Sequence, residues 1–123
     1  MKTLQLVLKR KWYDMISSGY KTEEYREIKP YWESRLGGCF RWCNQTLNNY
    51  GLHLDLSRCK ACSKDLNQNA SNRYDAVTFH LGYSKDRPSM TFAIKEIVID
   101  EGKEEWGALP GETYFVIKLG ERL

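Results

Sequence analysis

The sequence predicts an α+β fold, a small mixed β-barrel with two or three short helices. Apolar residues alternate with polar ones in several short segments, which is the period of a strand with one buried face. Two short amphipathic segments near the start are each followed by glycine, which indicates helices. The chain has 123 residues, enough for one hydrophobic core, so residues 1–123 are expected to form a single domain.

The composition is that of a folded protein and not of a disordered one, with 41% hydrophobic and 13% aromatic residues. The apolar run before Lys9 is too short for a signal peptide, and no segment reaches the length of a membrane span. We therefore expect a soluble, cytoplasmic protein without a membrane partner. The net charge of +3 arises within residues 1–35, where eight basic residues face five acidic ones, and this asymmetry suits a modest phosphate-facing surface.

The first half of the chain predicts two strands and two helices in alternation. Leu4, Leu6 and Leu8 define a strand over residues 3–8, and a helix over about residues 11–18 follows it. Gly19 is expected in the left-handed conformation that ends this helix. A second strand is predicted over about residues 22–27, and Pro30 marks the start of a short helix that ends near residue 37.

The second half predicts strands separated by turn residues. Val77, Phe79 and Leu81 alternate cleanly, and the segment 82–88 that follows them has turn composition. In the next strand the apolar phase slips at residues 95–96, which predicts a bulge or bend. Residues 114–119 are apolar on both faces, so this last strand is expected at the centre of the sheet.

The segment between about residues 39 and 73 is polar and lacks apolar periodicity, which predicts an insertion that loops out of the barrel. It holds all the cysteines, as Cys39-x3-Cys43 and Cys59-x2-Cys62. A cytosolic protein rarely keeps structural disulfides. Two cysteine pairs at this separation resemble a tetrahedral thiolate zinc site, in which Cys59-x2-Cys62 has the standard spacing and Cys39-x3-Cys43 departs from it. We therefore expect a structural Zn²⁺ in the insertion, with His53 as a substitute ligand; free thiols are the alternative.

The segment from Gly19 to Arg26 concentrates charge at a predicted helix-to-strand junction. Alternation along a strand would put Glu24 and Arg26 on one face and Lys21 on the other. A desolvated lysine near a carboxylate can act as base or nucleophile. An arginine beside it supplies a planar fork for phosphate or for a base edge. The alternatives are a salt-bridged cluster that only orients the strand, or a solvated edge strand.

A second candidate ligand surface is the turn of residues 82–88. Tyr83 offers a stacking face there and Lys85 a phosphate contact, a combination found in proteins that bind single-stranded RNA. The alternative is a solvated turn between two strands.

The pattern Gly19-x-Lys21-x-x-Glu24-x-Arg26 resembles the G-x-K-x-x-E-x-R signature of the ASCH domain family, relatives of the PUA-like RNA-binding barrels. The resemblance covers residues 1–36 and about 73–123 and leaves out the insertion. It implies a PUA-like barrel whose cleft binds RNA or a nucleotide through Lys21, Glu24 and Arg26.

Some small members of that superfamily are regarded as hydrolases of acetylated cytidine that use the motif lysine with a nearby hydroxyl residue. This chain departs from that pattern, because Glu24 stands where the hydroxyl would be and the adjacent hydroxyl is that of Thr22. A hydrolase with Lys21 and Glu24 as its catalytic residues is therefore the alternative to a binding module. A third possibility is an adaptor that recruits protein through the insertion.

Overall fold

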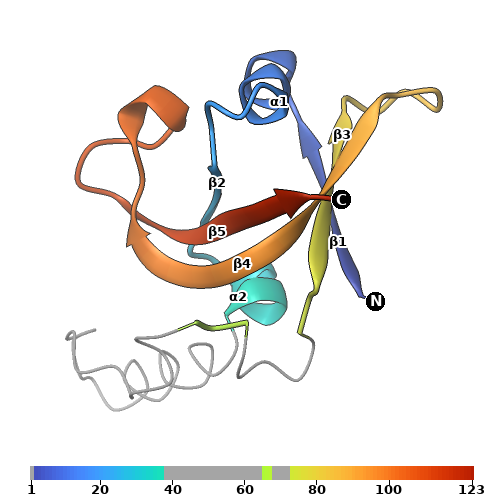
Figure 1. Cartoon of the computed structure of the whole chain (residues 1–123). Helices are drawn as coiled ribbons and strands as arrows, with labels where there is room; N and C mark the ends of the chain where they lie inside the picture. The colour runs from blue at the N-terminus through green and yellow to red at the C-terminus, as the bar shows by residue number, and fades with distance from the viewer. Residues whose placement is uncertain (1, 38–64, 68–72) are drawn as a thin grey trace, which may run out of the picture.

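The computed structural model describes residues 2–37, 65–67 and 73–123, which form a curled mixed sheet of five strands with two short helices (Figure 1). The predicted α+β class is confirmed. The elements are β1 (Thr3–Leu8), α1 (Arg10–Ser17), β2 (Glu23–Glu27), α2 (Pro30–Leu36), β3 (Ala76–Leu81), β4 (Ser89–Glu101), the 3-10 turn η1 (Glu104–Trp106) and β5 (Thr113–Arg122). None of the helices in these ranges is long and apolar enough to cross a bilayer.

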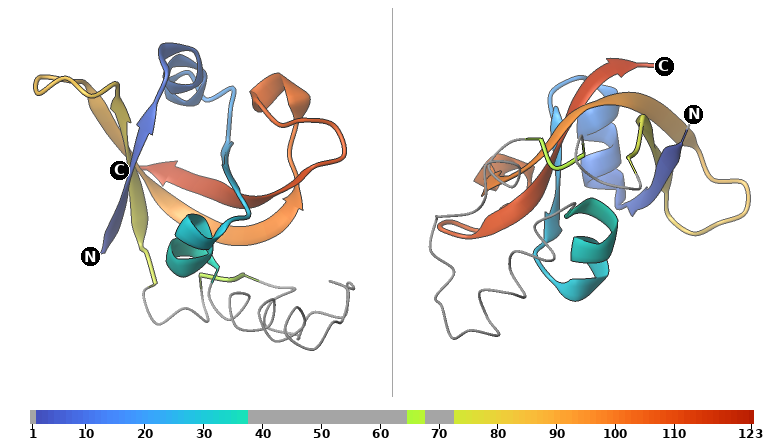
Figure 2. Two further views of the ribbon diagram at one scale, coloured as in Figure 1. Left: turned by 180° about the vertical axis from the view of Figure 1, so that it is seen from behind. Right: turned by 90° about the horizontal axis from the view of Figure 1, so that it is seen from below.

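The strands follow the order β1-β3-β4-β5-β2, with β1 parallel to β3 and the other neighbours antiparallel. In the described part of the chain β1 and β2 are the two edges of the sheet, and the sheet curls into a half-barrel (Figure 2). The curl comes largely from β4, a strand of 13 residues. Its pairing with β5 shifts register around Ile94 and Glu96, which confirms the predicted phase slip.

The core fills the concave side of the sheet. Alternate leucines of β1 are buried there with Ile16 of α1 and Leu36 of α2. The central position predicted for the last strand is confirmed, since Phe115, Val116 and Ile117 of β5 are each at most 1% exposed. Both faces of β5 are therefore covered.

The junction between α1 and β2 sets the position of the charged motif. Gly19 has φ +84°, the left-handed conformation expected of it. Glycine adopts this conformation with less strain than any residue that carries a side chain. The backbone N–H of Lys21 then donates to the carbonyl of Met15 at 3.0 Å. These contacts turn the chain back along α1 before β2 begins at Glu23.

Part of the predicted insertion belongs to the core. Leu66 is fully buried, and its N–H donates to the carbonyl of Ile97 in β4 at 2.8 Å. Asn67 is held by two hydrogen bonds between its side-chain amide and the backbone of Tyr74. Residues 65–67 thus anchor this end of the segment to the sheet.

Candidate functional site

A cleft of about 480 Å³ lies beside the motif, walled by the end of β1, by α1, β2 and α2, and by the segment that joins β4 to β5. Five aromatic side chains line it: Trp12, Tyr25, Trp32, Trp106 and Tyr114. Flat aromatic faces around a cleft are suited to binding a planar ring.

The charges that line the cleft are mainly positive. The lining residues comprise four cations and two carboxylates, a balance of +2: Lys9, Lys21, Arg26 and Lys29 against Glu24 and Glu27. Positive charge in a walled cleft attracts anions.

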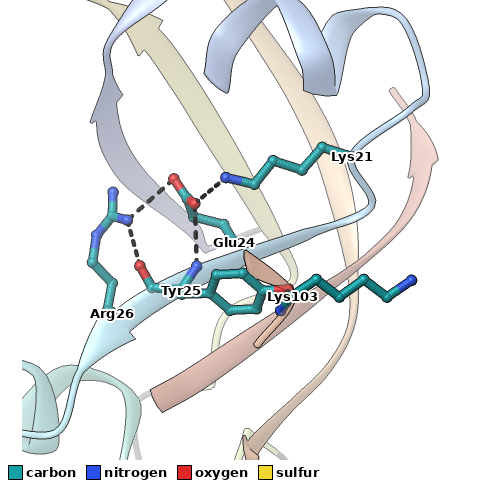
Figure 3. A network of polar contacts seen from close by, with 5 residues as sticks. All are labelled: Lys21, Glu24, Tyr25, Arg26 and Lys103. Atoms are coloured by element: carbon teal, nitrogen blue, oxygen red, sulfur yellow. Dashed lines mark hydrogen bonds and ion pairs between the residues drawn. The ribbon is translucent and has the colours of Figure 1, made fainter. Parts of the chain in front are cut away.

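Glu24 is the centre of a polar network on the cleft floor (Figure 3). Its Oε1 accepts hydrogen bonds from Lys21 Nζ at 2.8 Å and from the backbone N–H of Tyr25 at 3.1 Å. Its Oε2 lies 3.1 Å from Nη1 of Arg26. The structure thus brings together the three charged residues that the sequence singled out, although the side chains of Lys21 and Glu24 are only 1% and 6% exposed.

The expectation that Lys21 points to the opposite face from Glu24 is wrong. It assumed that strand alternation begins at Lys21, but β2 begins only at Glu23. Lys21 lies in the turn before the strand, where its N–H bonds to Met15 of α1. From there its side chain reaches the carboxylate three residues later, as Figure 3 shows.

Lys21 is enclosed by aromatic rings as well as by Glu24. Its Nζ lies 4.5 Å from the ring centroid of Trp12 and 5.7 Å from that of Tyr25, distances at which a ring face attracts a cation. Burial lowers the pKa of Lys21 from its ordinary 10.5; the charge and hydrogen bond of Glu24 oppose this shift, and Arg26 adds to it. Lys21 is therefore a desolvated cation held by one carboxylate and two rings.

Arg26 is the more exposed cation of the network, with 18% of its side chain exposed against 1% for Lys21, and it keeps N–H groups for a ligand. Its Nη1 is used by Glu24 and by the carbonyl of Tyr25, at 2.7 Å. A guanidinium has five N–H groups, and those on Nε and Nη2 of Arg26 have no partner among the described residues. Its Cζ lies 5.4 Å from the ring centroid of Trp32, which fixes the guanidinium against a wall of the cleft.

The same side chains also shield the free edge of β2. The N–H of Tyr25 donates to Glu24 and its carbonyl accepts from Arg26, so neither backbone group is left for another strand. This is the arrangement expected of a cluster that only orients and protects an edge strand, the alternative raised above. A ligand role and an edge role are compatible here, because Arg26 uses only one nitrogen for both contacts.

The wall formed by residues 102–112 was not anticipated from the sequence. Three tyrosine hydroxyls hold it: Tyr20 donates to Glu105 at 2.5 Å, Tyr25 accepts from the N–H of Lys103 at 3.0 Å, and Tyr114 accepts from the N–H of Leu109 at 3.0 Å. The signal available was Trp106, a large aromatic in a glycine-containing loop where exposed polar residues are the rule.

Two sets of predicted site residues do not meet the cleft. Tyr83 and Lys85 are absent from its lining, and Tyr83 is 87% exposed. The β3–β4 connection that carries them lies on the other side of the molecule from the β4–β5 segment that walls the cleft (Figure 1). The predicted zinc ligands Cys39, Cys43, Cys59 and Cys62, with His53, lie outside the described residues. Within residues 2–37, 65–67 and 73–123 no group of three metal-binding side chains occurs.

In comparisons with known proteins, the chain matches no family model, no curated protein and no solved structure. The sequence motif and the geometry of the cleft are therefore the grounds on which its function can be argued.

Proposed function

We propose that this protein is an ASCH-type domain that binds RNA or a nucleotide in the cleft beside Lys21, Glu24 and Arg26. The observation that carries the proposal is the combination of five aromatic side chains with a charge balance of +2 around one cleft. A nucleotide presents a flat base and an anionic phosphate, which need these two kinds of contact.

The three charged residues of the motif make different contacts, and this difference supports a binding role. Glu24 accepts two hydrogen bonds and forms an ion pair with Arg26, so its carboxylate is committed to holding Lys21 and Arg26 in place. Arg26 retains N–H groups for a phosphate or a base edge, and a planar fork suits both. Lys21 adds positive charge behind it, close to the rings of Trp12 and Tyr25.

The test is the affinity of purified protein for nucleoside monophosphates, measured by calorimetry before and after Arg26→Ala. We expect a loss of about 1–3 kcal/mol in binding free energy, the usual contribution of such an arginine. Arg122→Ala is the matched control, since Arg122 lies near the end of β5 and is not a lining residue. Equal losses from both variants would mean diffuse charge attraction in place of a site.

A second candidate function is hydrolysis of an acetylated nucleoside such as acetylcytidine, and the burial of Lys21 favours it. The lowered pKa of Lys21 brings its neutral form closer to working pH, and a neutral lysine could take a proton from water attacking the acetyl carbonyl. The lysine would then return this proton to the exocyclic nitrogen as the carbon–nitrogen bond breaks, giving acetic acid and the free exocyclic amine.

Two features favour binding over hydrolysis. The described lining contains no serine, threonine, cysteine or histidine, and Thr22 is exposed outside it. Glu24 moreover opposes the loss of the lysine proton. We therefore expect no acetate release from acetylcytidine by the wild-type protein; release that Lys21→Met abolishes would establish the hydrolase instead.

A further inference from the structure

We infer that the binding surface continues from the cleft over the exposed side of α2, where it takes the next nucleotide of a single-stranded RNA. The inference rests on the proposed function, because one base of the strand must occupy the cleft. It adds a ligand class: a strand of several nucleotides, and not a lone nucleotide.

The continuation is a row of two adjacent aromatic rings with a guanidinium group at each end. Arg26 lies 5.4 Å from the ring centroid of Trp32, and the Trp32 and Tyr31 rings are 4.7 Å apart and nearly perpendicular. Arg35 then lies 3.6 Å from the ring centroid of Tyr31. Trp32 lines the cleft, whereas Tyr31 is 54% exposed outside it. The row therefore runs without interruption from the cleft to the surface of α2.

The outer end of this row is held in place before any ligand arrives. Arg35 Nη1 donates to the carbonyl of Tyr31 at 2.9 Å and to Ser34 Oγ at 3.5 Å. Its guanidinium plane is thus fixed against the Tyr31 ring although both side chains are exposed. Bases of single-stranded RNA stack on aromatic rings and on arginine planes of this kind, and a fixed platform loses little entropy on binding.

The exposed side of α2 carries positive charge, which favours an anionic ligand. Among residues 29–36 the exposed charged side chains are Lys29 and Arg35, both cations, while Glu33 is buried. Exposed Glu27 lies 3.6 Å from Lys29, a solvent-screened pair that leaves Lys29 available. An acidic peptide would match the charge but not the succession of flat faces, so a nucleic-acid strand is the better match.

The experiment compares one short ligand with one longer one. Nucleoside monophosphates report on the cleft alone, and a fluorescein-labelled mixed-sequence RNA hexanucleotide reports on the cleft together with α2. We expect the hexanucleotide to bind wild-type protein more tightly. Tyr31→Ala and Arg35→Gln should each weaken hexanucleotide binding by roughly 5- to 150-fold, the range for one stacked base, while monophosphate affinity stays within about twofold.

Arg122→Gln is the matched control, because Arg122 also lies over a ring, that of Phe92 at 5.8 Å, away from the cleft. It should change neither affinity. A hexanucleotide that binds no better than a monophosphate would overturn the inference and leave the proposed function intact. Equal loss of both ligands in Tyr31→Ala, or equal hexanucleotide loss in Arg122→Gln, would also overturn it. Failure of wild-type protein to bind either ligand would instead refute the proposed function, and the inference with it.

Discussion

Replacing Glu24 with glutamine would leave the Lys21 ammonium buried without its counter-charge. The two side chains are 6% and 1% exposed and 2.8 Å apart, so water cannot take the place of the carboxylate. Removal of one partner from a buried pair typically costs about 3–5 kcal/mol. The protein can limit this cost by deprotonating Lys21, which at pH 7 requires about 5 kcal/mol for a group whose ordinary pKa is 10.5. We therefore expect a loss of about 3–5 kcal/mol in the free energy of unfolding.

Urea denaturation followed by tryptophan fluorescence measures this loss, since the chain has four tryptophans. Glu96→Gln is the matched control: Glu96 lies 3.3 Å from Lys118 Nζ, but both side chains are about one-third exposed. That surface pair should contribute less than about 1 kcal/mol. Lys21→Met combined with Glu24→Gln removes both charges, and it should be more stable than Glu24→Gln alone.

The pH dependence gives an independent check on the same reasoning. With Glu24 gone, the folded-state pKa of Lys21 falls further below its unfolded value of 10.5. Between these two values the unfolded chain binds more protons, so stability must rise with pH. The penalty of Glu24→Gln should accordingly shrink as pH approaches 10.5. A penalty no larger than that of Glu96→Gln, or one that does not change with pH, would refute the reasoning.

Three further predictions concern the lysine, the cleft wall and the insertion. In wild-type protein the lowered pKa of Lys21 should make the free energy of unfolding rise as pH increases toward 10.5, and Lys21→Met should lose this rise in a denaturation series over pH. Gly102→Ala should destabilise the protein by about 1–3 kcal/mol in urea denaturation, because the added Cβ would lie 2.6 Å from Cβ of Ala108; Gly111→Ala is a control with open space around it, sensitive only to backbone strain. Purified protein should carry about one equivalent of zinc by metal analysis, bound by thiolates, and a metal-free protein with all thiols reactive would contradict this. The expected ligands are Cys39, Cys43, Cys59 and Cys62.

The strands and helices could be predicted because their signals are local. Alternating leucines in β1 and the glycine after α1 specify period and chain reversal within a few residues. How far the barrel-like sheet closes could not be predicted in the same way, since closure depends on whether β1 and β2 pair. These strands are separated by only one helix in sequence, yet they lie at opposite ends of the sheet order.

The proximity of the three charged residues of the candidate site could be predicted, whereas the walls of its cleft could not. Lys21, Glu24 and Arg26 lie within six residues, so any turn into a strand keeps them near one another. The orientation of Lys21 depends on where β2 begins. The first residue of a strand is difficult to predict from the neighbouring sequence alone. Trp106 reaches the cleft only because three tyrosine hydroxyls from distant positions hold residues 102–112, a long-range effect that no local pattern carries.

Protection of the β2 edge has a consequence for self-association. Strand edges that are unpaired among the described residues can pair with other copies of the same chain, and the hydrogen bonds of Glu24 and Arg26 to Tyr25 remove one such docking point. Substitutions of Glu24 or Arg26 would then uncover backbone groups of Tyr25 that can pair with a neighbouring molecule. The two side chains would therefore limit aggregation whether or not the cleft binds a ligand.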